Sequence, residues 1–560
     1  MFLRIPLSGI SAVLRNIQVS SKTLLPVALL LLSADFTGSA KAEQQPAAVQ
    51  LDPQATPTPA PTANSGTPPA ATTTSSAPIM EASEQREIGR EDIFVRFTNQ
   101  GACIEDIQLK GFKNSLNSED NAHVTGGHFP CRALALKVND EDLRNTPSTF
   151  SKTGEGSAAL SQSNGNLLLT KAFNLSRPYT SDFRLTVKNT GQADWTGTVS
   201  IDLGGVSEIK GAGSIFGGHP MEYRDVVYHS DGEVKREKLT FVEHPVKETV
   251  FEKRSFVPDW VAANSLYFAF VAVPKTKEAL DLKIIRTGFN SAASRSLAPD
   301  RTLYEVWLTL TMGVIPSQGE KEIAFELFTG PKSKTALTAS SVQNLDRNID
   351  YGFFSVVAWP LYYFLSWCHK IFGNWGIAII ALTVVLKILL YPLTEKAFVA
   401  GKKMQKIQPE LNALKEKYKD DKQAQQKEMM AIMASKGVNP MSGCLPVLPQ
   451  LPIFFGLNAV LLHTFELRHA QFAGWLHDLT ARDPYYVTPA LMAVLMYVQQ
   501  KLTPAPATMD PAQQKMMQFL PIIFAVFMLT YPSGLVLYII TNTVLSLAQQ
   551  QYMMKKHKSA

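Results

Sequence analysis

A single lysine interrupts one of the most apolar stretches of this 560-residue chain. Lys387 is the only charged residue between Ala378 and Leu390, in the sequence AIIALTVVLKILL. Placing a cation in hydrocarbon costs free energy, so ionisable residues inside membrane spans usually face a polar cavity and mark a functional site. About eight residues, or about 12 Å of helix, separate Lys387 from Glu395, where the predicted cytoplasmic segment begins. We therefore favour a polar cavity over the two alternatives, which are a side chain that reaches the membrane surface and a local ion pair.

Uncharged polar residues accompany Lys387 in its own span and in two later spans. Thr383 lies one helical turn before Lys387 and on the same face. The others are Gln450 in the second span and Tyr538, Thr541 and Asn542 in the fifth. If these side chains converge, they form a hydrated polar site inside the bilayer.

Such a site has to be held by membrane helices, and the sequence predicts five. The predicted spans cover about 376–393, 444–462, 487–500, 517–531 and 533–550. The last two belong to one apolar block that is too long for a single span and contains the turn sequence Tyr531-Pro532-Ser533-Gly534. Residues 374–554 are therefore the predicted membrane core.

Charged residues between the spans predict their orientation. The segment Glu395–Lys436 contains ten lysines against six acidic residues, whereas the loop Glu466–Tyr485 contains two arginines against three acidic residues. The tail, residues 555–560, is again rich in lysine. Because positive segments favour the cytoplasmic side, we expect the segment 395–438 and the C-terminus to lie in the cytoplasm.

The first 42 residues have the pattern of an export signal. The apolar run Leu24–Leu32 follows basic residues and precedes Ala40-Lys41-Ala42. Nine residues cover only about 14 Å of a hydrocarbon core of about 30 Å, so we expect cleavage after Ala42; the alternative is an uncleaved anchor. Residues 43–87, rich in Pro, Ala and Thr, are a predicted disordered linker. Whether the signal is cleaved or remains as an anchor, the domain that follows the linker is exported.

The exported domain, 88–345, shows apolar residues at every second position, which is typical of strands with one buried face. The clearest examples are Ile93, Val95 and Phe97; Val199, Ile201 and Leu203; Tyr304, Val306, Leu308 and Leu310; and Ile323, Phe325 and Leu327. Glycine and asparagine clusters separate these runs. The predicted fold class is therefore mixed: an antiparallel β-sandwich, plus an α-helical five-span core with a cytoplasmic helical hairpin.

Little in the chain points to catalysis. The four cysteines contain no C-x-x-C pair, so no structural zinc site is expected. No cofactor is predicted. Cys103 and Cys131 lie in the exported domain, where a disulfide between them is predicted, with two buried free thiols as the alternative. Gly211-Ala212-Gly213 lacks the spacing of a phosphate loop and is interpreted as turn glycines. A net charge of +6 does not suggest nucleic-acid binding.

Residues 346–373 are predicted to form an amphipathic helix on the outer membrane surface. The stretch Tyr351–Cys368 is uncharged and about long enough to span. A span here would move the β domain to the cytoplasmic side, against the charge pattern, and Pro360 interrupts the stretch. Its aromatic residues suit the membrane interface.

The cytoplasmic segment, 395–438, is predicted to be a helical hairpin. A coiled-coil seam is indicated by the 3,4,3,4 spacing of Met404, Ile407, Leu411, Leu414 and Tyr418. The polar turn is Lys419-Asp420-Asp421-Lys422, and the returning arm carries Met429, Met430 and Met433 as its apolar face. The hairpin is either self-contained or a docking arm for nascent chains or ribosomes.

Motifs in the C-terminal half resemble the YidC/Oxa/Alb insertase family. They are Asn374-Trp375-Gly376, Tyr391-Pro392-Leu393-Thr394, Asn439-Pro440, Gly443-Cys444, Gln450-Leu451-Pro452-Ile453-Phe454, Asp483-Pro484-Tyr485-Tyr486 and Pro532-Ser533-Gly534-Leu535-Val536-Leu537-Tyr538. The resemblance covers about 346–552, and the β domain is similar, more diffusely, to the large periplasmic domain of Gram-negative members.

The resemblance implies a membrane protein insertase and chaperone in the bacterial inner membrane, with its large domain in the periplasm. It implies a hydrophilic groove, open to the cytoplasm and to lipid, in which Lys387, Thr383, Gln450, Tyr538 and Asn542 would contact the client. Partners would be nascent membrane proteins, the Sec translocon, the lipid bilayer and, through the hairpin and basic tail, the ribosome.

Three features depart from the family. It usually has arginine where Lys387 stands, so the charge is kept but the bidentate fork is lost. Gram-negative members often have two tyrosines where this chain has Tyr538-Ile539, and they begin with an uncleaved span.

Two other classes of function fit the sequence less well. A transporter or channel would also place charge inside the membrane, but the sequence shows no repeated halves. An intramembrane hydrolase with Lys387 as base would need a nucleophilic serine, and none has a suitable setting. We therefore expect a protein that is not an enzyme.

Overall fold

The computed structural model describes residues 86–557, apart from 99, 114–120, 126–132, 205, 210–224, 240–241, 243–246, 288–300, 420, 438–446 and 503–510. The predicted signal or anchor, nearly all of the predicted linker, Gly211–Gly213 and Cys131 lie outside the described residues.

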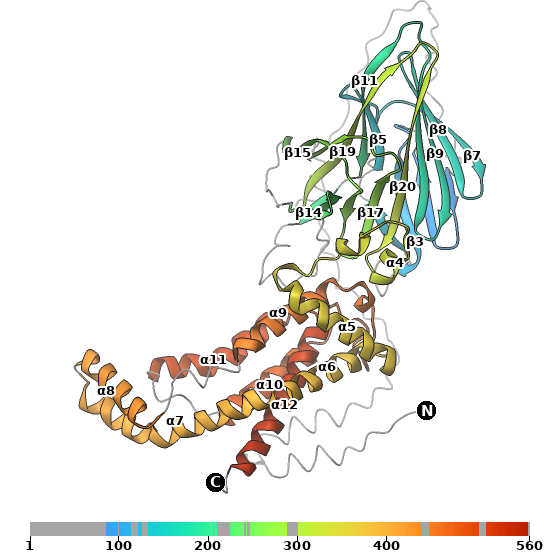
Figure 1. Cartoon of the computed structure of the whole chain (residues 1–560). Coiled ribbons are helices and arrows are strands. Elements are labelled where there is room, and N and C mark those ends of the chain that lie inside the picture. Colours follow the sequence, from blue (N-terminus) through green and yellow to red (C-terminus); the bar gives the residue numbers. More distant parts are fainter. Residues whose placement is uncertain are drawn as a thin grey trace, which may run out of the picture. The chain divides into compact units, whose positions relative to one another are not determined.

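The N-terminal domain consists of two antiparallel sheets (Figure 1). One sheet has the order β1-β2-β3-β5-β11-β19-β18-β15, with β4, β6 and β12 paired to β3, β5 and β19. Its strands are β1 (Glu87–Gly89), β2 (Ile93–Phe97), β3 (Ile104–Lys113), β4 (Asn121–Thr125), β5 (Ala133–Val138), β6 (Glu141–Asp142), β11 (Trp195–Leu203), β12 (Val206–Ile209), β15 (Glu248–Phe256), β18 (Leu280–Thr287) and β19 (Arg301–Ile315).

The second sheet has the order β14-β13-β16-β17-β20-β10-β9-β8-β7. Its strands are β7 (Ser148–Gly154), β8 (Ser157–Asn164), β9 (Leu167–Arg177), β10 (Thr180–Asn189), β13 (Asp225–Ser230), β14 (Glu233–Glu237), β16 (Trp260–Asn264), β17 (Phe268–Pro274) and β20 (Glu320–Pro331).

Period-two alternation explains how the two sheets share a core. In β2, Ile93, Val95 and Phe97 are buried while the two residues between them are partly exposed. The other apolar residues predicted from alternation, on β11, β19 and β20, are also buried and join the same cluster. Burial of one face of each strand is what the sequence pattern requires, so the predicted antiparallel β-sandwich is confirmed.

The sandwich encloses the fully buried side chain of Lys171 on β9. Its ammonium group donates hydrogen bonds to the carbonyl oxygens of Gly101 (3.1 Å), Ala102 (2.7 Å) and Leu134 (2.6 Å). Ala102 and Leu134 both have positive φ angles, 48° and 61°. Three carbonyls thus match the three donors of a lysine and hold the starts of β3 and β5 together.

The C-terminal part of the chain is helical (Figure 1). Its helices are α5 (Ser355–Phe372), α6 (Trp375–Leu389), α7 (Tyr391–Lys417), α8 (Lys422–Ser435), α9 (Val447–His463), α10 (Val487–Leu502), α11 (Pro511–Met528) and α12 (Ser533–Lys556), preceded by the short α4 (Lys334–Ala339). Helices α6, α9, α10, α11 and α12 overlap the five predicted spans.

Within the described part of the chain, no single helix is long and apolar enough to cross a membrane alone. One bent pair, α6 and α7 joined at 59°, meets that requirement when its two helices are taken together, by length and composition. The five spans therefore remain a prediction.

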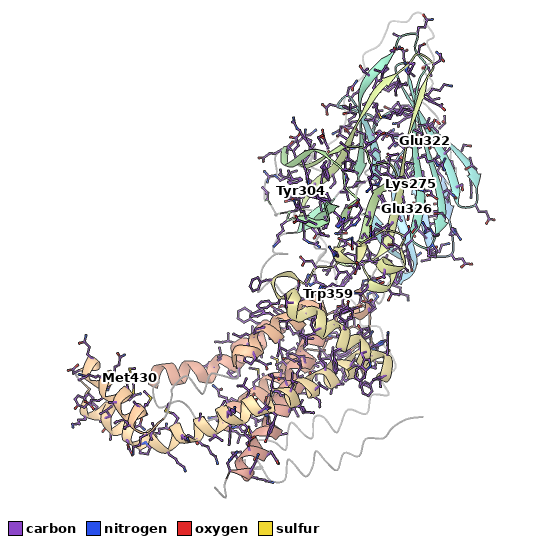
Figure 2. The ribbon with its side chains drawn as sticks, viewed as in Figure 1. Lys275, Tyr304, Glu322, Glu326, Trp359 and Met430 are labelled. Carbon is purple, nitrogen blue, oxygen red and sulfur yellow. The ribbon has the colours of Figure 1, made fainter. Side chains whose placement is uncertain are left out.

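Helices α7 and α8 form the helical hairpin (Figure 1). Ile407, Leu411 and Met433 are buried between them, and the Asp421 carboxylate caps α8 by accepting hydrogen bonds from two backbone N–H groups. The prediction for Met430 is wrong, because its side chain is 67% exposed (Figure 2). A residue next to Met429 lies about 100° away around the helix, so Ile432 takes the expected place of Met430.

Helix α5 has one buried and one exposed face. Ala358, Leu361 and Leu365 are buried, whereas Tyr363 and Trp367 are more than half exposed. The expected interruption by proline is wrong, because α5 runs through Pro360. Pro360 is exposed, so solvent can reach the carbonyl whose helical hydrogen bond it removes.

Candidate functional site

Lys387 lies in the last turn of α6 and reaches across to α12. Its Nζ donates a 2.7 Å hydrogen bond to Ser546 Oγ, and that hydroxyl donates a 2.7 Å bond to the backbone carbonyl of Asn542. Among the described residues, Ser546 is the only hydrogen-bond partner of Nζ, and no carboxylate lies within ion-pair distance of it. The cation is therefore bound to a neutral group, and none of the described carboxylates compensates its charge locally.

The backbone bends immediately beyond this lysine. Helix α6 ends at Leu389, two residues after Lys387, and Pro392 stands in the first turn of α7. Proline fits the first turn of a helix, where its missing N–H has no helical acceptor. The helix therefore ends much sooner after Lys387 than the sequence suggested.

A second polar pair joins α9 to α12. Gln450 Nε2 donates a 2.7 Å hydrogen bond to the hydroxyl of Tyr538, whose side chain is buried. Tyr538, Asn542 and Ser546 are spaced four residues apart, so they lie along one face of α12. The two pairs are thus separated by about 12 Å along that helix, with α9 contacting one end of the polar face and α6 the other.

The remaining predicted site residues bond mainly within their own helices. Thr383 is buried, and its hydroxyl donates to the carbonyl of Ile379 at 2.7 Å. Thr541 donates in the same way to Leu537 at 2.8 Å. The structure thus links Lys387 with Ser546 and the Asn542 backbone, and Gln450 with Tyr538, whereas hydrogen bonds do not join Thr383 or Thr541 to either pair.

Sequence reasoning missed Ser546, the partner of Lys387. Its signal was present, because Ser546 continues the four-residue spacing of Tyr538 and Asn542. Gln549 extends the same face of α12, and its buried Nε2 makes no hydrogen bond with the described residues.

One end of the helical bundle is closed by the loop between α9 and α10. Asn374 caps α6 by accepting from the Ile377 N–H at 3.1 Å, and its amide donates to the carbonyl of Phe472 at 2.9 Å. At Gly376 an added Cβ would lie 2.0 Å from the Phe472 ring. Only glycine allows this approach, which explains the Asn374-Trp375-Gly376 motif.

The same loop binds the starts of α10 and α12. The buried Asp483 carboxylate accepts from both the backbone N–H and the hydroxyl of Thr488, at 2.7 and 2.8 Å. The Ser533 N–H donates to the Ala481 carbonyl at 2.7 Å, and the Gly534 N–H donates to Leu479 at 2.9 Å. Three helix N-termini are thus fixed by one loop.

Helices α6, α9, α10, α11 and α12 all expose large apolar side chains. Examples are Ile388 and Leu389 on α6, Leu451 on α9, Tyr497 on α10, Phe519, Ile522 and Val526 on α11, and Val544 on α12. Extended apolar surfaces are rare on soluble monomers and are typical of surfaces that contact lipid or another protein.

At the C-terminal end of α12, charged side chains tie it to α7. Glu395 accepts from Lys556 Nζ at 2.7 Å and lies 3.1 Å from His557 Nε2, while Lys402 Nζ donates to the His557 carbonyl at 3.1 Å. All of these groups are partly or largely exposed, so each contact contributes little to stability.

In the β domain, Cys103 is disulfide-bonded. Its predicted partner, Cys131, lies outside the described residues, so the pairing with Cys131 remains a prediction. Cys368 on α5 is a buried free thiol.

Two family models match the chain. The family described as 60Kd inner membrane protein matches residues 367–560, and the family described as YidC periplasmic domain matches residues 87–364.

Two relatives are similar to this chain over most of their length. The chain is 34% identical over 472 residues to a protein of Citrifermentans bemidjiense named membrane protein insertase YidC. The matched region covers 82% of this chain and 83% of the relative. The chain is 31% identical over 546 residues to the protein of the same name from Nitrosococcus oceani, over 89% and 93% of the two chains. A crystal structure described as active YidC insertase with the first transmembrane domain resolved matches 83% of this chain and 93% of its own, at 18% identity and a TM-score of 0.36.

Proposed function

Because this chain belongs to the YidC family of membrane protein insertases, we propose that it inserts newly made integral membrane proteins into the bacterial inner membrane and helps them fold. The observation that carries this proposal is the environment of Lys387. A cation within a membrane costs free energy unless it faces a polar site, and among the described residues the only hydrogen-bond partner of Lys387 is a neutral hydroxyl. Such a lysine keeps a positive charge with which to attract an acidic or polar segment of a client.

The polar face of α12, with Lys387 and Gln450 beside it, would line a hydrophilic groove. We propose that Thr383 and Asn542 also line this groove, as the family resemblance implies. The loop that fixes the starts of α6, α10 and α12 would close the groove on the outer side, which leaves the cytoplasmic side and lipid as its openings. In that arrangement a client segment enters from the cytoplasm.

We propose that α6, α9, α10, α11 and α12 cross the membrane. The lysine-rich hairpin and the C-terminal tail would lie in the cytoplasm, as their positive charge favours, and the β-sandwich would lie in the periplasm. The exposed apolar residues of α6, α9, α10 and α11 would then contact lipid. Helix α5, with its exposed Tyr363 and Trp367, would lie on the outer surface.

Insertion needs no covalent step in this mechanism. The client's polar segment would bind transiently in the groove while its apolar helix moves into the surrounding lipid. Burial of that helix releases free energy of roughly 25 cal/mol per Å² of apolar surface, which can drive the transfer. The charge of Lys387 would lower the barrier for the polar segment.

Two kinds of partner follow from this arrangement. The hairpin offers basic side chains and the exposed Met430 (Figure 2) to ribosomes or nascent chains, since methionine adapts to varied apolar surfaces. We also propose cooperation with the Sec translocon, as the resemblance implies.

Site-specific crosslinking to a stalled nascent membrane protein tests this function. A photoreactive residue at 450, 383 or 542 should capture the client, whereas the same residue at Val385, on another face of α6, is the matched control. Crosslinks along the polar face, above the level at Val385, support insertion. Solute flux in liposomes without client crosslinks would instead indicate a transporter.

A further inference from the structure

We infer that Ser546 is a positioning residue that holds the Lys387 ammonium against α12, inside the helical bundle, between client insertions. Its hydroxyl accepts from Lys387 Nζ at 2.7 Å while donating to the Asn542 carbonyl at 2.7 Å. One hydroxyl thus serves as acceptor for the cation and is itself oriented by the backbone of the helix that carries it.

A restraint of this kind is needed because of where Lys387 lies. Helix α6 ends two residues later, and the neighbouring side chains of Ile388 and Leu389 are 69% and 71% exposed. A lysine this close to a helix end can extend its flexible stem toward water and leave the bundle. The bond to Ser546 opposes that movement, and it links α6 to α12 without a competing negative charge.

A neutral partner suits this role better than a carboxylate. An acidic residue at 546 would form an ion pair with Lys387, and the client would then have to displace it. A hydroxyl binds the ammonium more weakly, so a client carboxylate can take its place. A lysine also needs only one well-placed acceptor to be held, whereas the planar fork of arginine binds best to two.

The position of Lys387 can be measured apart from its role. In inside-out membrane vesicles of the full-length protein, a water-soluble amine-reactive reagent added from outside would label Lys387, and mass spectrometry of its peptide would quantify the labelling. Ser546→Ala removes the acceptor and should increase labelling of Lys387. Ser546→Thr keeps a hydroxyl and should restore the wild-type level.

Thr543→Ala is the matched control, because Thr543 is a buried residue of α12 whose hydroxyl donates to Ile539 at 2.8 Å. This variant should leave the labelling of Lys387 unchanged. A general loosening of α12 would instead raise labelling in both alanine variants. Equal labelling in the wild type and Ser546→Ala would overturn the inference.

The consequence for insertion rests on the proposed function. Ser546→Asp should accumulate normally, since the new carboxylate pairs with Lys387, but should lose client insertion. Ser546→Asn introduces an uncharged side chain of the same shape as aspartate and should retain insertion. If Ser546→Ala raises labelling while Ser546→Asp inserts clients fully, Ser546 still positions Lys387, and it is the proposed role of the charge that fails. If Ser546→Asp does not accumulate in the membrane, the labelling of Lys387 in Ser546→Ala alone decides whether Ser546 positions the lysine.

Discussion

The Gln450 amide on α9 donates a 2.7 Å hydrogen bond to the Tyr538 hydroxyl on α12. Both helices also contribute apolar residues to one buried cluster. In a low-dielectric setting an unpaired amide or hydroxyl is costly, so the pair fixes how the two helices face one another. The bond should therefore contribute to stability as well as to the polar face of α12.

Removal of the tyrosine hydroxyl should destabilise the bundle. Tyr538→Phe leaves the Gln450 amide without its partner, and the free energy of unfolding should fall by roughly 1–2 kcal/mol. Thermal unfolding in detergent measures the effect. Tyr485→Phe is the control, because Tyr485 is 70% exposed, and it should change little. If Tyr538→Phe is as stable as the wild type, the bond is not significant.

A methyl group at Gly376 should disrupt the closed end of the bundle. The Cβ of Gly376→Ala would lie 2.0 Å from the Phe472 ring, and displacing that ring should cost roughly 1–3 kcal/mol. Gly401→Ala on α7 is the matched control, since nothing lies within 4 Å of its added Cβ, and it should be neutral or slightly stabilising. Equal melting temperatures for the two variants would contradict the packing described here.

The buried Lys171 predicts a pH dependence of the β domain's stability. Burial lowers the pKa of Lys171 to about 7, from 10.5. Between these values the unfolded chain binds one proton more than the folded chain, so the free energy of unfolding should rise with pH across this window, by up to about 1.4 kcal/mol per pH unit.

Lys171→Met removes this titration and also leaves three carbonyls without their donor. Denaturant unfolding of the full-length protein at pH 7 and 9, followed through the buried Trp260 and Trp307, should show a stability gap between wild type and variant that widens at the higher pH. A gap that does not change with pH would mean that the ammonium remains charged in its carbonyl cage.

The disulfide of Cys103 should join it to Cys131. The loop would be about 28 residues long, and closing it should stabilise the domain by roughly 3–4 kcal/mol. Mass spectrometry of unreduced peptides should find Cys103 linked to Cys131. Alkylation of both cysteines without prior reduction would exclude the pair.

The β domain was predictable from sequence because a strand with one buried face has an apolar residue at every second position. Ile93, Val95 and Phe97 needed no knowledge of partner strands to be placed in a core. The helices of the predicted spans were also predictable from local sequence, because each contains a continuous apolar segment. The local sequence pattern was sufficient to predict an element wherever the residues of that element alone determine which of its faces is buried.

Relations between elements were not predictable. Whether Lys387 meets Ser546, Thr383 or an acid depends on how α6 packs on α12, and no spacing within α6 encodes this. The bend after Leu389 likewise depends on the packing of α7. The prediction for Met430 was wrong because the packing of Ile407, Leu411 and Met433 determines which face of α8 is buried. Of the two neighbouring methionines, Met429 packs against this cluster and Met430 does not.

The side chain of Thr383 should matter less than that of Lys387. Its hydroxyl bonds to its own helix, so Thr383→Ala should reduce client insertion only mildly, by the equivalent of about 1 kcal/mol. Client insertion in membrane vesicles, normalised to protein level, measures this. A loss as complete as that expected for removal of the Lys387 charge would contradict the lesser role of the Thr383 hydroxyl.

Lys387 provides the most direct test of the central claim, that a positive charge in this bundle acts on clients. A depletion strain would be complemented with wild type, Lys387→Leu or Lys387→Arg, and client insertion measured together with protein level. Lys387→Leu should accumulate at or above the wild-type level, because it removes a cation from an apolar helix, yet should not insert clients. Lys387→Arg should retain insertion. Full insertion by Lys387→Leu would contradict the account.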